Sequence, residues 1–346
     1  MAKTASQKPV TEPTNLPPKF YIFPWLQNAW GQITQTRNEK RLHHAYLISG
    51  LPGLGKLDLA YHIAHSLLCT KPDPHTGYPC GQCRGCHLFQ VGNHPDIQRL
   101  GPDPESKSGE IKVEAARNLV DFNELTSQSG GYKVIIIAPA DGMNRYSANS
   151  LLKTLEEPTP FTIILLVTTQ PGRLLATIRS RCQHLPIAVP PEPEALAWLT
   201  AQVRVPPDQL QLALRLAHGA PLTALKFNHD ILQQRQTNVR MFFEFTAGKH
   251  SPSSIATQWI QQDLAQLIDW LSTWIADIAR FQTGSPVYLD NPDLATYLHT
   301  QSTKYSSVTI HKFWSKVLNT RQHLQTNLNP QLLIETLLIQ WRDLQS

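Results

Sequence analysis

The sequence predicts an α/β protein in which a parallel sheet covered by helices is followed by a helical region. Short, near-continuous apolar runs alternate with helical periodicity over residues 45–189, which is typical of parallel sheets covered on both faces. A glycine-rich loop follows the first apolar run. A proline cluster at residues 190–193 marks a boundary, and beyond it only helical periodicity remains.

Length and charge set the broad class of the protein. The chain has 346 residues, enough for two or three domains, and a net charge of +5 that is too small to indicate nucleic-acid binding by itself. No apolar run is long enough for a membrane helix, and the N-terminus lacks the apolar segment of a signal peptide. We therefore expect a cytoplasmic protein without membrane partners. Five cysteines, an odd number, favour metal ligands or free thiols over a disulfide framework.

The first elements can be assigned in chain order. Residues 1–20 are rich in Lys, Thr and Pro, and we expect them to form a disordered tail. Residues 45–48 read as a buried strand, and the loop at residues 50–57 follows it. The next helix has apolar residues at i, i+4 spacing, as in Leu59, Ile63 and Leu67. Strand, glycine loop and helix is the context in which phosphate loops occur.

The loop at residues 50–57, GLPGLGKL, matches a phosphate loop except at its last position. Backbone N–H groups of such a loop hold phosphates, its Lys reaches the β- and γ-phosphates, and a closing Ser or Thr binds Mg²⁺. The candidate nucleotide-binding residues are Gly50, Gly53, Gly55 and Lys56. Leu57 stands where the hydroxyl is needed, and its side chain cannot bind a cation that prefers oxygen ligands.

A second half of an ATPase site is expected after the strand at residues 133–137. An Asp-Glu pair there positions Mg²⁺ and polarises the attacking water. Ala138 and Pro139 occupy those positions, and Asp141 is at most a weak stand-in. We expect no enzymatic activity from the isolated chain, whereas ATP or ADP binding stays an open alternative.

Four of the cysteines have the spacing of a metal site. Cys69 is followed by a turn-rich segment and then by Cys80, Cys83 and Cys86. Four thiolates at this spacing suit a tetrahedral Zn²⁺ ion, and a fully protein-ligated ion is structural rather than catalytic. Alternatives are a cluster of buried or redox cysteines, or substitution of one ligand by a nearby histidine: His75, His87 or His94.

The rest of the sheet domain and the tail follow the same alternation. We expect a strand near residues 96–100, a helix at 112–125, a helix from about 147 closed by Pro158, a strand at 162–169, a short helix at 173–179 and a last strand at 183–189. Helices alone are expected beyond that, in a small unit at 190–230 and a longer region at 231–346.

Several of these motifs together resemble the bacterial clamp-loader subunits of the AAA+ family. They are HHAYLISG before the loop, the spacing of the four cysteines, NSLLKTLEEP at residues 149–158 and SRC at 180–182. The resemblance implies a RecA-like AAA+ domain at 21–189 with a zinc module at 69–86. It also implies a helical lid domain at 190–230 and an all-helical collar domain at 231–346 through which five subunits form a ring.

Within this family the chain is more similar to the non-hydrolysing type than to the γ/τ motor type. Three parts of one ATPase site are lost: the magnesium hydroxyl at Leu57, the Asp-Glu pair at Ala138-Pro139, and a phosphate-sensing arginine of the lid at Leu222. Arg181 of the SRC motif matches the arginine finger that such subunits insert into a neighbour's site. Thr168 matches a polar sensor, but without the carboxylates we interpret it as a core hydroxyl.

The resemblance also implies partners: the γ/τ and δ subunits in a hetero-oligomeric ring, the β sliding clamp and primed DNA. Lys153, Glu156 and Glu157 are expected on a ring-contact surface or, alternatively, on a plain solvated helix face. Two other functions stay open, a nucleotide-hydrolysing motor subunit and a stand-alone, zinc-dependent DNA-binding protein.

Overall fold

The computed structural model describes residues 21–103, 110–284, 288–324 and 328–345. The expected tail at residues 1–20 and positions 104–109 of a predicted polar loop lie outside the described residues. The chain divides into two compact units, Met1–Ala188 and Val189–Ser346. Among the described helices, none combines the length and apolar character needed to cross a membrane.

The first unit contains a five-stranded parallel sheet. Its strand order is β2-β3-β4-β1-β5, and every neighbouring pair is parallel. The strands are β1 (Ala45–Ser49), β2 (Ile97–Leu100), β3 (Lys133–Ile137), β4 (Thr162–Thr168) and β5 (Gln183–Pro186). The last strand is shorter than expected because its partner β1 ends at Ser49, where the glycine loop begins. The carboxyl ends of β1, β3 and β4 therefore meet at one edge of the sheet.

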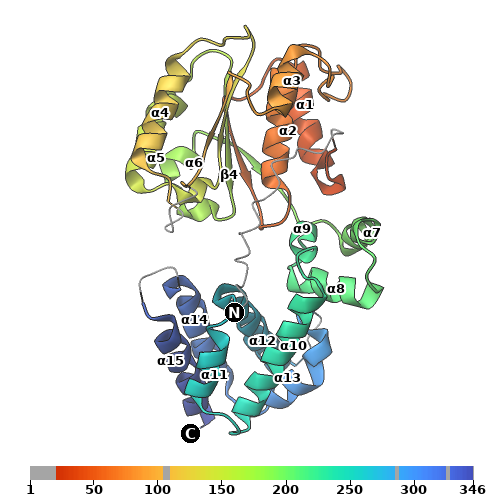
Figure 1. Ribbon diagram of the computed structural model, residues 1–346, viewed down its shortest axis with the longest axis vertical. Helices are drawn as coiled ribbons and strands as arrows, with labels where there is room; N and C mark the ends of the chain where they lie inside the picture. The colour runs from red at the N-terminus through yellow and green to blue at the C-terminus, as the bar shows by residue number, and fades with distance from the viewer. Residues whose placement is uncertain (1–20, 104–109, 285–287, 325–327, 346) are drawn as a thin grey trace, which may run out of the picture. The chain divides into compact units, whose positions relative to one another are not determined.

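Helices cover both faces of this sheet, as its apolar strands predict (Figure 1). Alternate strand residues such as Leu47, Ile135 and Leu166 share one core with α4 (Val113–Glu124), α5 (Arg145–Glu156) and α6 (Ala176–Arg179). The other face is covered by α2 (Lys56–Leu68), which is accompanied by α1 (Gln27–Asn38) and α3 (Arg84–Gln90). The short 3₁₀ helix η1 (Pro24–Leu26) leads into α1.

The second unit is helical throughout its described residues. It begins with three short helices, α7 (Glu192–Gln202), α8 (Pro207–Leu216) and α9 (Pro221–Ala224). Six further helices follow: α10 (His229–Thr246), α11 (Pro252–Trp259), α12 (Leu264–Gln282), α13 (Ala295–Ser302), α14 (Ser307–His323) and α15 (Pro330–Arg342). Their core contains three tryptophans that are fully buried: Trp259, Trp274 and Trp341. The predicted α/β class with a helical C-terminal region is confirmed.

A buried polar network crosses the interior of the second unit. Arg235 of α10 is 1% exposed and donates to Asp293 Oδ2 at 2.7 Å and to Asn291 Oδ1 at 2.7 Å. The backbone N–H of Asn291 donates in turn to Asp277 Oδ2 at 2.8 Å. Buried polar groups are nearly always hydrogen-bonded. Here their hydrogen bonds join α10 and α12 to the segment before α13.

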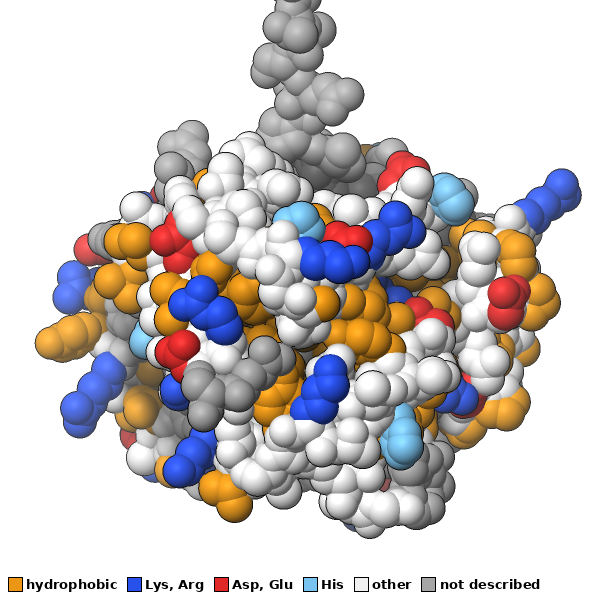
Figure 2. All heavy atoms as spheres, turned by 90° about the horizontal axis from the view of Figure 1, so that it is seen from below, with side chains coloured by type: hydrophobic (Ala, Val, Ile, Leu, Met, Phe, Trp, Pro, Cys, Tyr) orange, Lys and Arg blue, Asp and Glu red, His pale blue; other side chains and the backbone are white. Residues whose placement is uncertain are grey.

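One face of the second unit exposes apolar side chains. Figure 2 shows them gathered near the middle of the face, with Lys, Arg and His side chains around them. Helices α14 and α15 expose Leu318, Leu332 and Ile339, and Leu328 is exposed just before α15. A groove of 370 Å³ lies between these two helices. Apolar surface of this kind is typical of contacts with other proteins.

Candidate metal centre and phosphate-loop site

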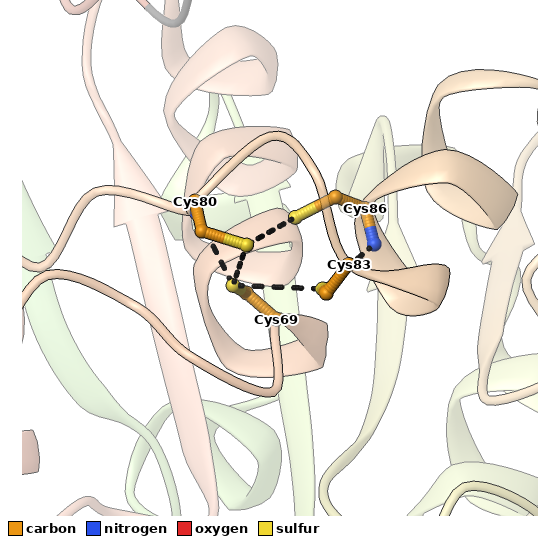
Figure 3. Close-up of side chains that lie close together, drawn as sticks. All are labelled: Cys69, Cys80, Cys83 and Cys86. Atoms are coloured by element: carbon orange, nitrogen blue, oxygen red, sulfur yellow. Dashed lines mark hydrogen bonds between the residues drawn. The ribbon is translucent and has the colours of Figure 1, made fainter.

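The four predicted ligands come together in the first unit (Figure 3). Cys69 ends α2, Cys83 caps the N-terminus of α3 and Cys86 lies in the first turn of α3. The Sγ atoms of Cys69 and Cys80 are 3.5 Å apart, those of Cys80 and Cys86 3.9 Å, and those of Cys69 and Cys83 3.9 Å. All four sulfurs lie within 4.8 Å of one another.

These distances fit a tetrahedral zinc site. With Zn–S bonds of about 2.3 Å, the sulfurs at the corners of a tetrahedron are about 3.8 Å apart. A disulfide needs about 2.05 Å, so the closest pair at 3.5 Å is not one. Four thiols supply all the ligands of such a site, so the ion it suits is structural. The alternative histidine ligands His75, His87 and His94 lie outside this group of metal-ligand atoms.

The four thiols differ in how easily they ionise: burial raises the pKa values of Cys69 and Cys86, whereas hydrogen bonds lower those of Cys80 and Cys83. The backbone N–H of Cys80 donates to Cys69 Sγ at 3.2 Å, and that of Cys86 donates to Cys83 Sγ at 3.4 Å. Burial opposes ionisation of Cys83, but hydrogen bonds from Thr70 and from the Cys86 backbone lower the pKa of its thiol to about 5. Thiolates held by N–H donors in this way are the usual ligands of structural zinc.

The fifth cysteine has a different environment. Cys182 of the SRC motif is 8% exposed and packs in the core beneath α4, α5 and α6. Burial raises the pKa of this thiol to about 12, so it stays protonated at neutral pH. Cys182 is therefore a small core residue, and the odd cysteine count is accounted for by four candidate metal ligands plus one packed thiol.

The three glycines of the phosphate loop all have positive φ. The angles are +149° at Gly50, +77° at Gly53 and +75° at Gly55. Gly55 is the left-handed N-cap of α2, and Lys56 is the first residue of that helix. Lys56 is 6% exposed, and its Nζ donates to the carbonyl of Leu51 at 2.6 Å. Burial lowers the pKa of Lys56 to about 8, although Asp141 opposes the change.

Two of these glycines are also required by packing within the unit. A Cβ at Gly50 would lie 2.6 Å from the backbone oxygen of Ile187, and one at Gly55 would lie 2.6 Å from the ring of Phe23. Side chains cannot approach that closely. The Phe23 ring is stacked on Trp25 with centroids 5.1 Å apart, and Trp25 Nε1 donates to the carbonyl of Leu54 at 3.0 Å. An aromatic pair therefore lies against the loop that would hold phosphates.

On the side of the expected carboxylates, Asp141 is the acidic residue of the described segment that follows β3, residues 138–144. Its Oδ1 accepts hydrogen bonds from the Thr168 hydroxyl and, at 3.3 Å, from the backbone N–H of Thr169. Thr168 is 1% exposed, which agrees with its interpretation as a satisfied core hydroxyl. Ala138, in the place of the metal-binding Asp, is buried in the unit. The side chains at Leu57 and Ala138 thus offer no oxygen to a magnesium ion.

Arg181 lies at the surface of the first unit, just after α6. Its Nη2 forms an ion pair with Glu156 Oε1 at 2.6 Å, and its Nη1 donates to the carbonyl of Thr177 at 2.9 Å. The side chains of Arg181 and Glu156 are 35% and 48% exposed. A guanidinium has five N–H donors, so the two contacts described here leave donors for a further acceptor.

Comparison with known proteins decides the family. Three family models match the chain: "DNA polymerase III, delta subunit" at residues 25–191, the AAA+ ATPase lid domain of "DNA polymerase III subunit delta'" at 190–227, and "DNA polymerase III, delta subunit, C terminal" at 229–343. DNA polymerase III subunit δ′ of Pseudomonas aeruginosa is 36% identical over 328 residues, covering 93% of this chain and 98% of the relative.

The chain belongs to the family of DNA polymerase III subunit δ′. The δ′ subunit of Escherichia coli is 35% identical over 92% of this chain and 94% of its own length. That of Haemophilus influenzae is 35% identical over 74% of this chain and 76% of its own length. The resemblance seen in the sequence motifs is confirmed.

Two features of the site were missed by reasoning from the sequence. Residues 21–25 entered the sequence analysis only as the start of the domain at 21–189, although the Phe23 ring lies against Gly55 and Trp25 donates to the Leu54 carbonyl. Glu156 was assigned to a ring-contact surface or a solvated face, and its ion pair with Arg181 was not foreseen. Glu156 and Arg181 are separated by 24 positions in the sequence. The sequence therefore hinted at their ion pair only by containing both motifs, residues 149–158 and 180–182.

Proposed function

We propose that this chain is a non-hydrolysing subunit of the DNA polymerase III clamp loader. In this role it occupies a hetero-oligomeric ring with γ/τ and δ subunits, in the cytoplasm, and helps the ring place the β sliding clamp on primed DNA. The observation that carries the proposal is a contrast within one unit. The chain's own phosphate-loop site lacks the groups for hydrolysis, while Arg181 is half-exposed and has donors to spare.

The absence of hydrolysis follows from the chemistry of the pocket. Phosphoryl transfer depends on Mg²⁺ and on a group that orients the attacking water. Leu57 and Ala138 offer neither a hydroxyl nor a carboxylate, and the carboxylate of Asp141 is engaged by Thr168 and Thr169. The Lys56 ammonium is bonded to its own loop at Leu51. Electrostatic groups of this kind are each worth several orders of magnitude in rate.

Arg181 supplies a charge where the neighbouring ATPase needs one. An arginine donated in trans to a γ-phosphate is worth roughly 10³–10⁵ in rate. Its ion pair with Glu156 is half-exposed, and such pairs contribute only about 0.2–1 kcal/mol. A phosphate with a higher charge can therefore replace Glu156 as the partner of Arg181 at little cost.

Ring partners are supported by the surface of the second unit. Leu318, Leu332 and Ile339 are exposed on α14 and α15, and Leu332 and the exposed Leu328 line the groove between these helices. A hetero-oligomeric contact would bury this apolar area, which stabilises association by about 25 cal/mol for each Å² removed from water. The proposed collar is thus residues 231–346 of the second unit, after the lid at 190–230, and the first unit carries the proposed finger.

The test is Arg181→Ala in a loader reconstituted from all its subunits, with Arg173→Ala as the matched control. Arg173 is an exposed arginine of the same stretch of the chain. We expect single-turnover ATP hydrolysis at the adjacent site to fall by roughly 10³-fold or more with Arg181→Ala, and to be unchanged with Arg173→Ala. Full activity of the Arg181 variant would exclude the finger.

Nucleotide hydrolysis by the chain itself is tested separately. We expect the isolated protein to hydrolyse ATP no faster than a Lys56→Ala control. A rate above that control would favour the motor-type alternative, for which the surviving glycines and Lys56 are the only support. The stand-alone DNA-binding alternative predicts DNA affinity of the isolated chain that falls steeply with salt and is lost when zinc is removed.

A further inference from the structure

The segment between the first two zinc ligands, residues 70–79, packs on helix α1; we name it the cysteine loop. Trp30 Nε1 of α1 donates to the carbonyl of Thr76 at 2.8 Å, and Asn38 Nδ2 donates to the carbonyl of Pro74 at 3.1 Å. The rings of Trp30 and Tyr78 lie 5.7 Å apart. These contacts join the loop to both ends of α1.

The tip of the cysteine loop is inserted between α1 and α2. Gly77 has a φ of +73°, and a Cβ there would lie 2.6 Å from Thr34 Oγ1 of α1. The Gly77 carbonyl accepts a hydrogen bond from Ser66 Oγ of α2 at 2.5 Å, and Arg37 Nη1 donates to the same hydroxyl at 2.6 Å. The loop therefore fixes α1 against α2 through backbone groups that require one loop conformation.

The cysteine loop has hydrogen bonds of its own but almost no buried side chains. Most of its side chains are exposed, and Gly77 is its one buried residue. Asp73 Oδ1 accepts from the backbone N–H groups of His75 and Thr76 at 2.9 and 2.7 Å. The Asp73 N–H donates to the Tyr78 carbonyl at 2.8 Å and the Gly77 N–H to the Asp73 carbonyl at 2.9 Å, so these bonds close a turn over residues 73–78 but do not reach Cys69 or Cys80. A loop without an apolar core is stabilised by whatever ties its two ends together. In this chain the ends are Cys69 and Cys80.

The other end of α1 leads directly to the phosphate loop. Helix α1 has 12 residues, about 18 Å at 1.5 Å per residue. The segment just before it carries Phe23, whose ring contacts Gly55, and Trp25, which donates to the Leu54 carbonyl. A helix moves as a rigid element, so a shift of α1 displaces this aromatic pair.

We propose that the zinc-tied cysteine loop, by fixing α1, holds the Phe23–Trp25 pair against the phosphate loop and so determines how accessible that loop is to a phosphate. Trp30 and Asn38 are the positioning residues of this coupling. The metal centre then has a role beyond local folding, since its state is transmitted over the length of α1 to the site where a nucleotide phosphate would lie. The inference stands whether or not Arg181 acts as a finger.

The test uses the full-length, zinc-loaded chain and hydrogen–deuterium exchange measured on peptides. Asn38→Ala removes the hydrogen bond to Pro74, and Asn28→Ala is the matched control because Asn28 is an exposed asparagine of the same helix. We expect Asn38→Ala to raise exchange about threefold to tenfold, the effect of losing one hydrogen bond. The increase should appear in peptides covering residues 70–79, 21–30 and 50–57.

Increased exchange confined to residues 70–79 would overturn the coupling, as would equal effects of the two asparagine variants. Removal of zinc with a chelator should give a larger increase in the same three peptides, with peptides of the second unit unchanged. If chelation unfolds the whole first unit, the Asn38 variant, which keeps all four cysteines, decides alone.

A second readout is ADP binding by calorimetry. We expect ADP to bind the Asn38→Ala and Trp30→Phe variants about threefold to tenfold more tightly than the parent chain, since the aromatic pair is released from the loop. Unchanged or weaker ADP binding, together with increased exchange at residues 50–57, would show that the aromatic pair does not control access.

Discussion

Replacement of Lys56 by methionine tests whether the phosphate-loop lysine is a remnant. Burial lowers its pKa from 10.5 to about 8, which corresponds to roughly 3 kcal/mol against the charged form at about 1.4 kcal/mol for each pH unit. The hydrogen bond from Nζ to the Leu51 carbonyl, a charged one, offsets about 1.5–2 kcal/mol of this. Lys56→Met should therefore stabilise the first unit by about 1 kcal/mol at pH 7.

The pH dependence gives this prediction a sign that can be checked. Because the folded-state pKa of Lys56 is lowered, the unfolded chain binds more protons between about pH 8 and pH 10.5, and the parent protein gains stability as pH rises through that window. The methionine variant lacks this gain. Its advantage over the parent should be fully present below pH 8, should vanish within about one pH unit above pH 8, and should reverse by about pH 10.5, because the parent gains roughly 3 kcal/mol across that window.

The assay is equilibrium unfolding in urea, read by hydrogen exchange in peptides from β3 and β4 so that only the first unit is reported. Lys153→Met, at an exposed lysine of α5, is the control for a general effect of losing one charge. A Lys56→Met variant that is destabilised at pH 7, or whose advantage does not change with pH, would refute the reasoning and make Lys56 a stabilising residue of the loop.

Two further substitutions test packing in the two units. Gly55→Ala should destabilise the first unit by about 2–4 kcal/mol in urea unfolding, because the added Cβ clashes with Phe23 and the alanine is strained in a left-handed conformation. Gly92→Ala is the control: its φ is similar, +73°, but the space around it is open, so it should cost only about 1 kcal/mol. Equal costs for the two variants would show that the Phe23 ring moves aside freely. Arg235→Met should destabilise the second unit by about 2–4 kcal/mol, since it leaves Asn291 and Asp293 without their buried partner. A decrease in the free energy of unfolding below about 0.5 kcal/mol, measured by hydrogen exchange in peptides of α12, would contradict this prediction.

The fold could be predicted because its signals are local. The apolar runs of β1, β3 and β4 are too continuous for half-exposed strands, and alternation with helices then requires a parallel sheet. The cysteine ligands were predictable for a similar reason, since a tetrahedral site constrains the spacing along the chain. The choice against a histidine ligand came from the structure, which places His75, His87 and His94 outside the group.

The contacts that were not predicted join segments far apart in the sequence. Position 181 meets position 156 through the packing of α5 and α6, and residues 74–78 meet α1 across an insertion between two ligands. Side-chain partners of this kind depend on how the helices are placed on the sheet, which periodicity along one element does not specify. The losses at Leu57 and Ala138 were readable because they are absences at fixed motif positions.

The surviving part of the phosphate-loop motif has an explanation that does not need a nucleotide. Gly50 lies against the Ile187 backbone and Gly55 against the Phe23 ring, so a side chain at either position would disturb the first unit whatever the pocket binds. Lys56 is different, because burying its charge disfavours folding and only Leu51 and Asp141 counter this. The glycines are needed for packing, so their presence is compatible with loss of hydrolysis. Lys56 destabilises the folded state, so packing does not explain why a lysine is present at this position. The aromatic pair beside the loop supplies one candidate: if the pair moves when the cysteine loop is released, Lys56 is the group that an entering phosphate would meet.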